Sequence, residues 1–291
     1  MVTSPCTGVC KLDDMTGWCL GCGRSGEEIA QWRDYAEPRR EKIWAEIPGR
    51  LNELGVTCQR LPWTTDEIRT FVARSLERSD GTWVMGVVGA VAEFIAKPGA
   101  PINVTIREDH LLASTDGGAM GVVINGDVRA LTFDSPEAAE RPRSVLAVKR
   151  ERGRLPLANG VEHLGEDSGA LIDESATPLF DLGVGRKEAR FCVRVEDGPA
   201  RDALIRANGQ SLVESLPLIG PALISASPTR VVETALGRIE VQGQIPPPDA
   251  KSPAGPHTHL LPDHLAQNRV MPVGMDLPRA YLPGAIFYPP N

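Results

Sequence analysis

Apolar residues recur at helical spacing near the start of the chain and at strand spacing through most of the remainder. Ile43, Trp44 and Ile47 repeat at intervals of three and four, which predicts a helix from about Pro38. A second amphipathic helix is predicted to begin at Thr65. These two helices precede a long region in which β-branched residues dominate the apolar positions.

The strand-like segments indicate the fold class of this long region. Strands are predicted over residues 82–95, 102–106, 119–124, 129–133, 144–148, 189–195, 229–234 and 237–244. A helix is expected near 199–208, and Asn125-Gly126 is typical of a hairpin turn. Because the strands and helices do not alternate regularly, the pattern predicts an α+β fold with a mainly antiparallel or mixed sheet.

The pattern also divides the chain into two parts. Ser25 and Glu28 have the spacing of a capping box at the start of a short helix. Pro48-Gly49 is expected to end the helix that begins near Pro38, and a short helical piece then stops at Gly55. We therefore expect a small module over residues 1–55, with two or three short helices, and a larger α+β domain over 60–291.

Composition and charge narrow the functional classes. The 291 residues carry a formal net charge of −7, which argues against a general nucleic-acid binder. No apolar run approaches the roughly 18 residues of a membrane span, and no signal peptide is visible. The expected compartment is the cytoplasm, where clustered cysteines are more often metal ligands or redox groups than disulfides.

Four of the six cysteines lie within 17 positions near the N-terminus. Their spacing is C-x3-C-x8-C-x2-C, and Gly21 and Gly23 beside the last pair permit the tight turn of a metal knuckle. Four thiolates suit either tetrahedral Zn²⁺ or an iron–sulfur cluster. The predicted ligands of this first site are Cys6, Cys10, Cys19 and Cys22.

These residues carry a resemblance to a known family. The string from Ser4 to Arg50, with its Cys-Leu-Gly-Cys-Gly turn, resembles a short bacterial four-cysteine family of unknown function whose members are often labelled predicted Fe–S proteins. Other strings, including Trp83 to Phe94 and Leu236 to Glu240, resemble an uncharacterised C-terminal partner that is fused to this module in some bacterial proteins. The resemblance implies a four-cysteine metal module and supplies no chemistry for the larger domain.

Three of the five histidines gather in the segment GPHTHLLPDH. His257 and His259 are two residues apart, so an extended backbone would place both on one face, and His264 could fold back toward them. They are the predicted ligands of a second metal site. The alternative is a loop in which these histidines hydrogen-bond to neighbouring backbone.

Two functional hypotheses follow from these sites. The first is a metal-binding protein of unestablished activity, with a zinc or iron–sulfur module joined to a domain that binds a protein or a small molecule. The second is a metal-dependent enzyme or an electron-transfer protein that uses a site near His257 and His259. The sequence does not decide between them, and whether the protein is an enzyme stays open.

Overall fold

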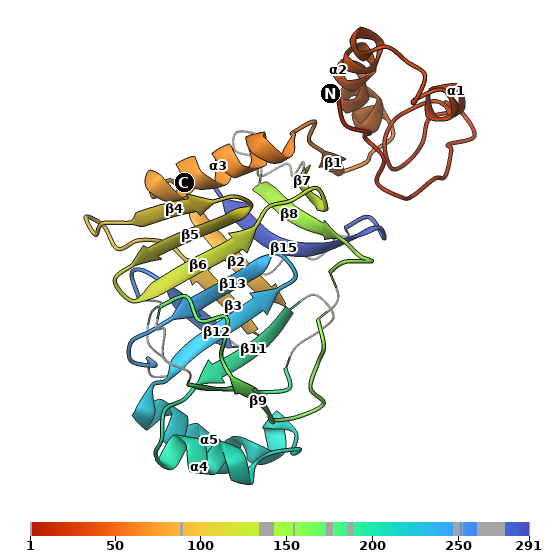
Figure 1. Ribbon diagram of the computed structural model, residues 1–291. Coiled ribbons are helices and arrows are strands. Elements are labelled where there is room, and N and C mark those ends of the chain that lie inside the picture. The colour runs from red at the N-terminus through yellow and green to blue at the C-terminus, as the bar shows by residue number, and fades with distance from the viewer. Residues whose placement is uncertain are drawn as a thin grey trace.

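The computed structural model describes residues 2–87, 90–133, 143–153, 155–172, 177–184, 189–246, 251, 253–260 and 277–290. In Figure 1 a small N-terminal helical module lies beside a body of two sheets, and two further helices lie at the opposite end of that body. The helices are α1 (Gly26–Ala30), α2 (Glu37–Glu53), α3 (Thr65–Glu77), α4 (Pro199–Arg206) and α5 (Leu212–Ala226).

Every pairing between the strands is antiparallel in the described residues. One sheet has the order β1-β7-β8-β15-β2-β3-β14 and the other the order β4-β5-β6-β13-β12-β11-β10-β9. The seven-stranded sheet consists of β1 (Cys58–Arg60), β7 (Val128–Phe133), β8 (Arg143–Lys149), β15 (Tyr281–Tyr288), β2 (Thr82–Val87), β3 (Ala90–Phe94) and β14 (His257–Leu260). The eight-stranded sheet consists of β4 (Asn103–Arg107), β5 (His110–Thr115), β6 (Gly118–Val123), β13 (Gly237–Val241), β12 (Thr229–Thr234), β11 (Ala189–Arg194), β10 (Pro178–Asp181) and β9 (Glu162–Glu166).

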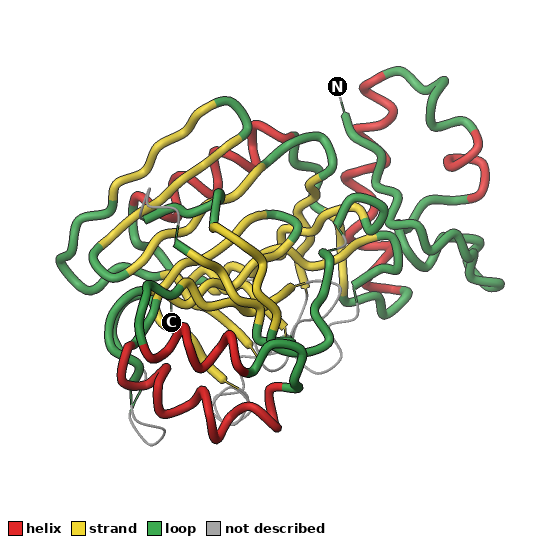
Figure 2. The backbone as a smooth tube through the Cα atoms, turned by 60° about the horizontal axis from the view of Figure 1, so that its bottom comes forward, coloured by secondary structure: helices red, strands yellow, loops and turns green. Residues whose placement is uncertain are grey.

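The two sheets pack face to face around one apolar core. Trp83 and Phe94 enter it from the seven-stranded sheet, while Met120 and Val232 enter it from the eight-stranded sheet. Helix α3 lies against β4, β5 and β7, and α4 packs on α5 (Figure 2). The predicted α+β class with a mainly antiparallel sheet is confirmed, because helices flank two large antiparallel sheets.

The N-terminal module has a small core of its own. The capping box is present, since Glu28 N–H donates to Ser25 Oγ and Ser25 N–H donates to the Glu28 carboxylate. The predicted break at Pro48 is wrong, because α2 continues through Pro48 to Glu53. Packing explains the continuity, since residues before and after the proline belong to one buried cluster. That cluster is Trp32, Ile43, Trp44, Ile47 and Leu51.

Two strand predictions need correction. The segment 82–95 is a pair of antiparallel strands, β2 and β3, rather than one strand. The turn at Asn125 exists, because Asp127 N–H donates to Asn125 Oδ1, but it does not close a hairpin. The strands on either side of it, β6 and β7, belong to different sheets, so the turn carries the chain across the core.

The described helices include none long and apolar enough to cross a membrane.

Candidate functional site

The backbone between Cys19 and Cys22 turns tightly around the sulfur atoms. Gly23 N–H donates to the Cys19 carbonyl at 2.8 Å, and Gly21 N–H points at Cys19 Sγ at 3.4 Å. Arg24 Nε lies 3.4 Å from Cys22 Sγ. Gly23 has φ +66°, a left-handed conformation that other residues rarely adopt. This half of the motif has the predicted form of a metal knuckle, with N–H donors directed at both sulfurs.

The first two cysteines lie in a loop that packs against this knuckle. Thr7 Oγ1 donates to the Gly21 carbonyl at 2.9 Å, and a Cβ added at Gly21 would lie 2.4 Å from Thr7 Oγ1. Only glycine therefore fits at position 21. All six cysteines are free thiols, so no disulfide competes for these sulfurs.

The thiols form two neighbouring pairs. Cys6 lies close enough to Cys10 to interact with it, Cys19 lies close to Cys22, and Cys10 also interacts electrostatically with Cys19. Cys19 and Cys22 are buried, whereas Cys10 is exposed. In the described part of the chain, no three or more His, Cys, Asp or Glu side chains are grouped so as to hold a metal ion. The knuckle thus fits a metal ligand pair, and the second pair lies next to it without converging on the same point.

The surroundings act on the two buried thiols in opposite ways. Burial raises the pKa of the Cys22 thiol, and the nearby Arg24 side chain opposes this rise. Burial also acts to raise the pKa of Cys19, but hydrogen bonds from Gly21 and Cys22 outweigh it and leave that pKa below its ordinary value. Cys19 is therefore the better thiolate of the knuckle pair.

The Cys6 carbonyl is one point where the module meets the seven-stranded sheet. Tyr281 Oη, at the start of β15, donates to this carbonyl at 3.1 Å. Arg60, the last residue of β1, reaches the same oxygen with Nη1 at 3.4 Å and also donates to the Ser4 carbonyl. Burial lowers the pKa of Arg60 to about 10. The large domain therefore supplies two donors to the backbone of a predicted metal ligand.

Of the predicted histidine site, the structure describes the side chain of His257 alone. Nδ1 lies 2.8 Å from the Gly255 carbonyl, and Nε2 lies 3.2 Å from Glu93 Oε2 on the neighbouring strand. Both His257 and Glu93 are buried. Nδ1 thus faces a neighbouring backbone carbonyl, as in the hydrogen-bonded alternative, while Nε2 faces a carboxylate, and the metal site at this residue stays a prediction.

The other two histidines have different outcomes. The segment at His259 is extended, as expected, and β14 pairs its backbone with Val91 of β3. The side chain of His259 and the whole of His264 lie outside the described residues. Their convergence on His257 stays a prediction.

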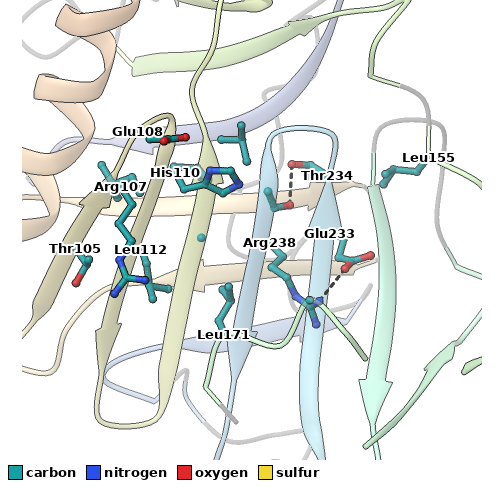
Figure 3. Close-up of a pocket in the computed structure, with 16 residues that line it drawn as sticks. Thr105, Arg107, Glu108, His110, Leu112, Leu155, Leu171, Glu233, Thr234 and Arg238 are labelled. Carbon is teal, nitrogen blue, oxygen red and sulfur yellow. Dashed lines mark hydrogen bonds and ion pairs between the residues drawn. The ribbon is translucent and has the colours of Figure 1, made fainter. Parts of the chain in front are cut away.

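A groove that the sequence did not predict crosses the outer face of the eight-stranded sheet (Figure 3). Its volume is about 950 Å³, within the usual range for sites that hold a small molecule. Arg107 and His110 come from the β4–β5 hairpin at one side, and Arg238 of β13 lies toward the other (Figure 3). Apolar side chains also line the groove, and they include Leu112, Val123, Leu155 and Leu171.

A buried ionic cluster lies beneath one end of this groove. Asp167 accepts from Arg238 Nη2 at 2.7 Å and from Arg194 Nη1 at 3.0 Å. Glu240 accepts from Arg194 Nη2 at 2.9 Å and from the Leu171 N–H at 2.9 Å. The contact to Leu171 fastens residues 167–172 onto the sheet, so the cluster fixes one wall of the groove.

Sequence reasoning missed this cluster although a signal was present. Charged residues alternate with apolar residues in Arg238-Ile239-Glu240, which is the pattern of a strand with one polar face. Such a face is normally assigned to solvent. Here the segment around Asp167 covers this polar face. The local sequence of β13 does not predict that another segment packs on it.

Two segments of the chain match known family models. Residues 67–291 match the model of a family of unknown function (DUF6925). Residues 4–51 match a second family model, which is described as protein of unknown function (DUF1289). No curated protein matches, and no solved structure matches. The resemblance of the N-terminal part to a four-cysteine family and of the remainder to a separate uncharacterised partner is confirmed. Since the first match spans more than half of the 291 residues, the chain belongs to the family of unknown function DUF6925, with a DUF1289 segment at its N-terminal end.

Proposed function

We propose that the protein binds one metal centre through Cys6, Cys10, Cys19 and Cys22. The observation that carries the proposal is the knuckle, in which Gly21 N–H and Arg24 Nε both point at cysteine sulfurs. Donors in these positions stabilise thiolate charge when a metal is bound. Cys6 and Cys10 form the adjacent pair that would complete a four-thiolate set.

Zinc and an iron–sulfur cluster both remain candidates, because each accepts four thiolates. Zinc would supply a structural link between the two cysteine pairs. A cluster would supply a one-electron redox group, and the indole of Trp32, over which the Arg24 guanidinium stacks at 4.7 Å, would shield its surroundings. In either case the residues of the chain hold the metal and exclude water from its buried side.

Metal analysis of the full chain tests this proposal. The protein is purified without oxygen, and its zinc, iron and sulfide contents are measured together with its absorption spectrum. We expect either about one zinc per chain without colour, or iron and sulfide with a band roughly near 400 nm. A double Cys19→Ser and Cys22→Ser variant should lose the metal. Cys192→Ala is the control, because this buried cysteine belongs to β11 and not to the motif.

The proposal would be overturned by wild-type protein that carries no more metal than the double variant.

A second candidate function is the binding of a small molecule in the groove of the eight-stranded sheet. The observation that favours it is the combination of an apolar lining with the guanidinium of Arg107 at one side. Such a site suits an organic anion whose apolar body lies over Leu112. Arg238 at the other side forms ion pairs with Asp167, Glu233 and Glu240, so it forms part of the wall and leaves the contact with the anion to Arg107.

A fluorescent aromatic sulfonate, anilinonaphthalene sulfonate, serves as the probe for this site. Leu112→Trp should fill the groove and abolish the gain in fluorescence on binding. Ile106→Trp is the matched control, because Ile106 lies on the neighbouring strand, is 50% exposed and does not line the groove. Equal fluorescence from both variants and from the wild type would place the probe elsewhere and remove this candidate.

The enzyme hypothesis based on the C-terminal histidines has less support. His257 Nε2 faces the Glu93 carboxylate and Nδ1 faces a carbonyl, so this residue is already engaged. The proposed function is therefore built on the four cysteines, and the roles of His259 and His264 stay predictions.

A further inference from the structure

The loop that carries Cys6 and Cys10 is held by its own module through Thr7, and it is also held from outside that module. Cys19 and Cys22 receive their hydrogen bonds from residues of the module, namely Gly21 and Arg24. The Cys6 carbonyl instead accepts from Tyr281 at 3.1 Å and from Arg60 at 3.4 Å. These two donors belong to strands β15 and β1 of the seven-stranded sheet.

Both donors have fixed positions because they are buried. Tyr281 is 5% exposed and Arg60 is 8% exposed. Neither side chain can swing into solvent without losing its packing, so each restricts where the Cys6 backbone can lie.

The same loop also fits closely against the residue before Tyr281. Gly8, between the two cysteines, has φ +79°, and a Cβ at this position would lie 2.5 Å from the Cβ of Ala280. The glycine therefore permits an approach that any side chain would prevent. Three contacts, at Ser4, Cys6 and Gly8, thus fit this loop to the large domain.

We propose that Tyr281 and Arg60 are positioning residues for the metal centre, so that the four-cysteine site reaches its full affinity only when the seven-stranded sheet is folded against it. The proposal rests on metal binding by the four cysteines as proposed above. Its basis is the uneven support of the two cysteine pairs, because only the Cys6 loop receives hydrogen bonds from the seven-stranded sheet in addition to those from its own module. Outer contacts of this kind commonly change metal affinity about 10- to 100-fold when removed.

The coupling must act in both directions. If the folded sheet raises metal affinity, then metal binding stabilises the folded sheet by the same factor. A metal bound near the N-terminus would therefore protect β15, which lies near the C-terminal end of the sequence.

Competition for zinc between the full chain and a coloured chelator tests the proposal. Tyr281→Phe removes the hydroxyl that contacts Cys6 and keeps the buried ring, and we expect about tenfold weaker zinc binding. Arg60→Met is a second variant that removes both carbonyl contacts and keeps a long apolar stem. Tyr288→Phe is the matched control on the same strand, at its other end from Tyr281, and it should bind zinc as the wild type does.

The coupling is read separately from affinity by melting each protein with and without zinc. Zinc should raise the melting temperature of the wild type more than that of Tyr281→Phe, and the quantity compared is this shift, because the loss of the hydrogen bond to Cys6 also lowers the melting temperature of the zinc-free variant. Wild-type affinity in both Tyr281→Phe and Arg60→Met would overturn this inference and leave metal binding intact. A wild-type protein that binds no metal would instead overturn the proposed function.

Discussion

Asp167 lies between the guanidinium groups of Arg194 and Arg238, and all three side chains are almost completely buried. Removing one member of such a group leaves an uncompensated charge away from water, which usually costs more than the pair itself contributes. Burial alone would raise the pKa of Asp167, but the two arginines outweigh it and hold this pKa below the ordinary value of 3.8.

We expect Asp167→Asn to lower the free energy of unfolding at pH 7 by on the order of 3 kcal/mol, because Arg194 and Arg238 lose their shared carboxylate. Because the folded protein holds the proton of Asp167 less tightly than the unfolded chain does, this stabilisation is present above pH 3.8 and is lost as the pH falls through the lowered pKa. The variant should therefore show a weaker loss of stability on acidification.

Urea unfolding, followed by circular dichroism at neutral and acidic pH, measures both effects. Asp116→Asn is the control, because Asp116 is 81% exposed and pairs with a solvent-exposed lysine. If the two variants were equally stable at pH 7, the buried cluster would not contribute in this way.

Single residues differ in how far the sequence predicts them. The Ser25 capping box and the knuckle glycines are local features, so their spacing along the chain is enough to identify them. The partners of Asp167 lie 27 and 71 positions away, and no local pattern connects them. Cys19 and Cys22 are recognisable because their spacing is local. The groove at Arg238 is missed because its residues come from distant parts of the chain.

Helix α5 shows that local sequence is also an incomplete guide to a whole element, because packing against distant residues decides whether it forms. Ser211 and Glu214 form a capping box at its start, yet Pro217 and Pro221 lie inside it and argue against a helix in the sequence. The helix persists because one side packs on the core, where Ile219 is completely buried. Its other side remains apolar and exposed, and this side includes Val213, Leu216 and Ile224.

The orientation of α5 predicts that two similar substitutions lower the free energy of unfolding by very different amounts. Ile219→Ala should lower the free energy of unfolding by about 2–5 kcal/mol, because it leaves a cavity in the core. Val213→Ala should change it by less than about 0.5 kcal/mol, because Val213 is 79% exposed. Denaturant unfolding of the two variants checks the assignment, and similar losses in both would mean that the exposed side of α5 is covered in solution.

Across the whole molecule, the sequence predicted which segments are helices or strands better than it predicted which strands pair with one another. The α+β class and the antiparallel character followed from the strand pattern, and the cysteine module followed from its spacing. The pairing of β15 between β8 and β2 joins segments more than a hundred residues apart. The Asn125 turn shows why pairing failed, because its local chemistry is that of a hairpin while the two strands enter different sheets.

The short strand β1 lies outside both matched segments, since Cys58–Arg60 falls between residue 51 and residue 67. It is nevertheless hydrogen-bonded to β7 through three consecutive residue pairs, and it carries the arginine that reaches Cys6. A flexible linker would let each part keep its shape after the two were exchanged or cut apart. Here the junction is itself part of a sheet. A gene rearrangement that removed β1 with the N-terminal segment would leave the edge of β7 unpaired. One that kept only the N-terminal segment would leave the cysteine loop without the hydrogen bonds from the large domain.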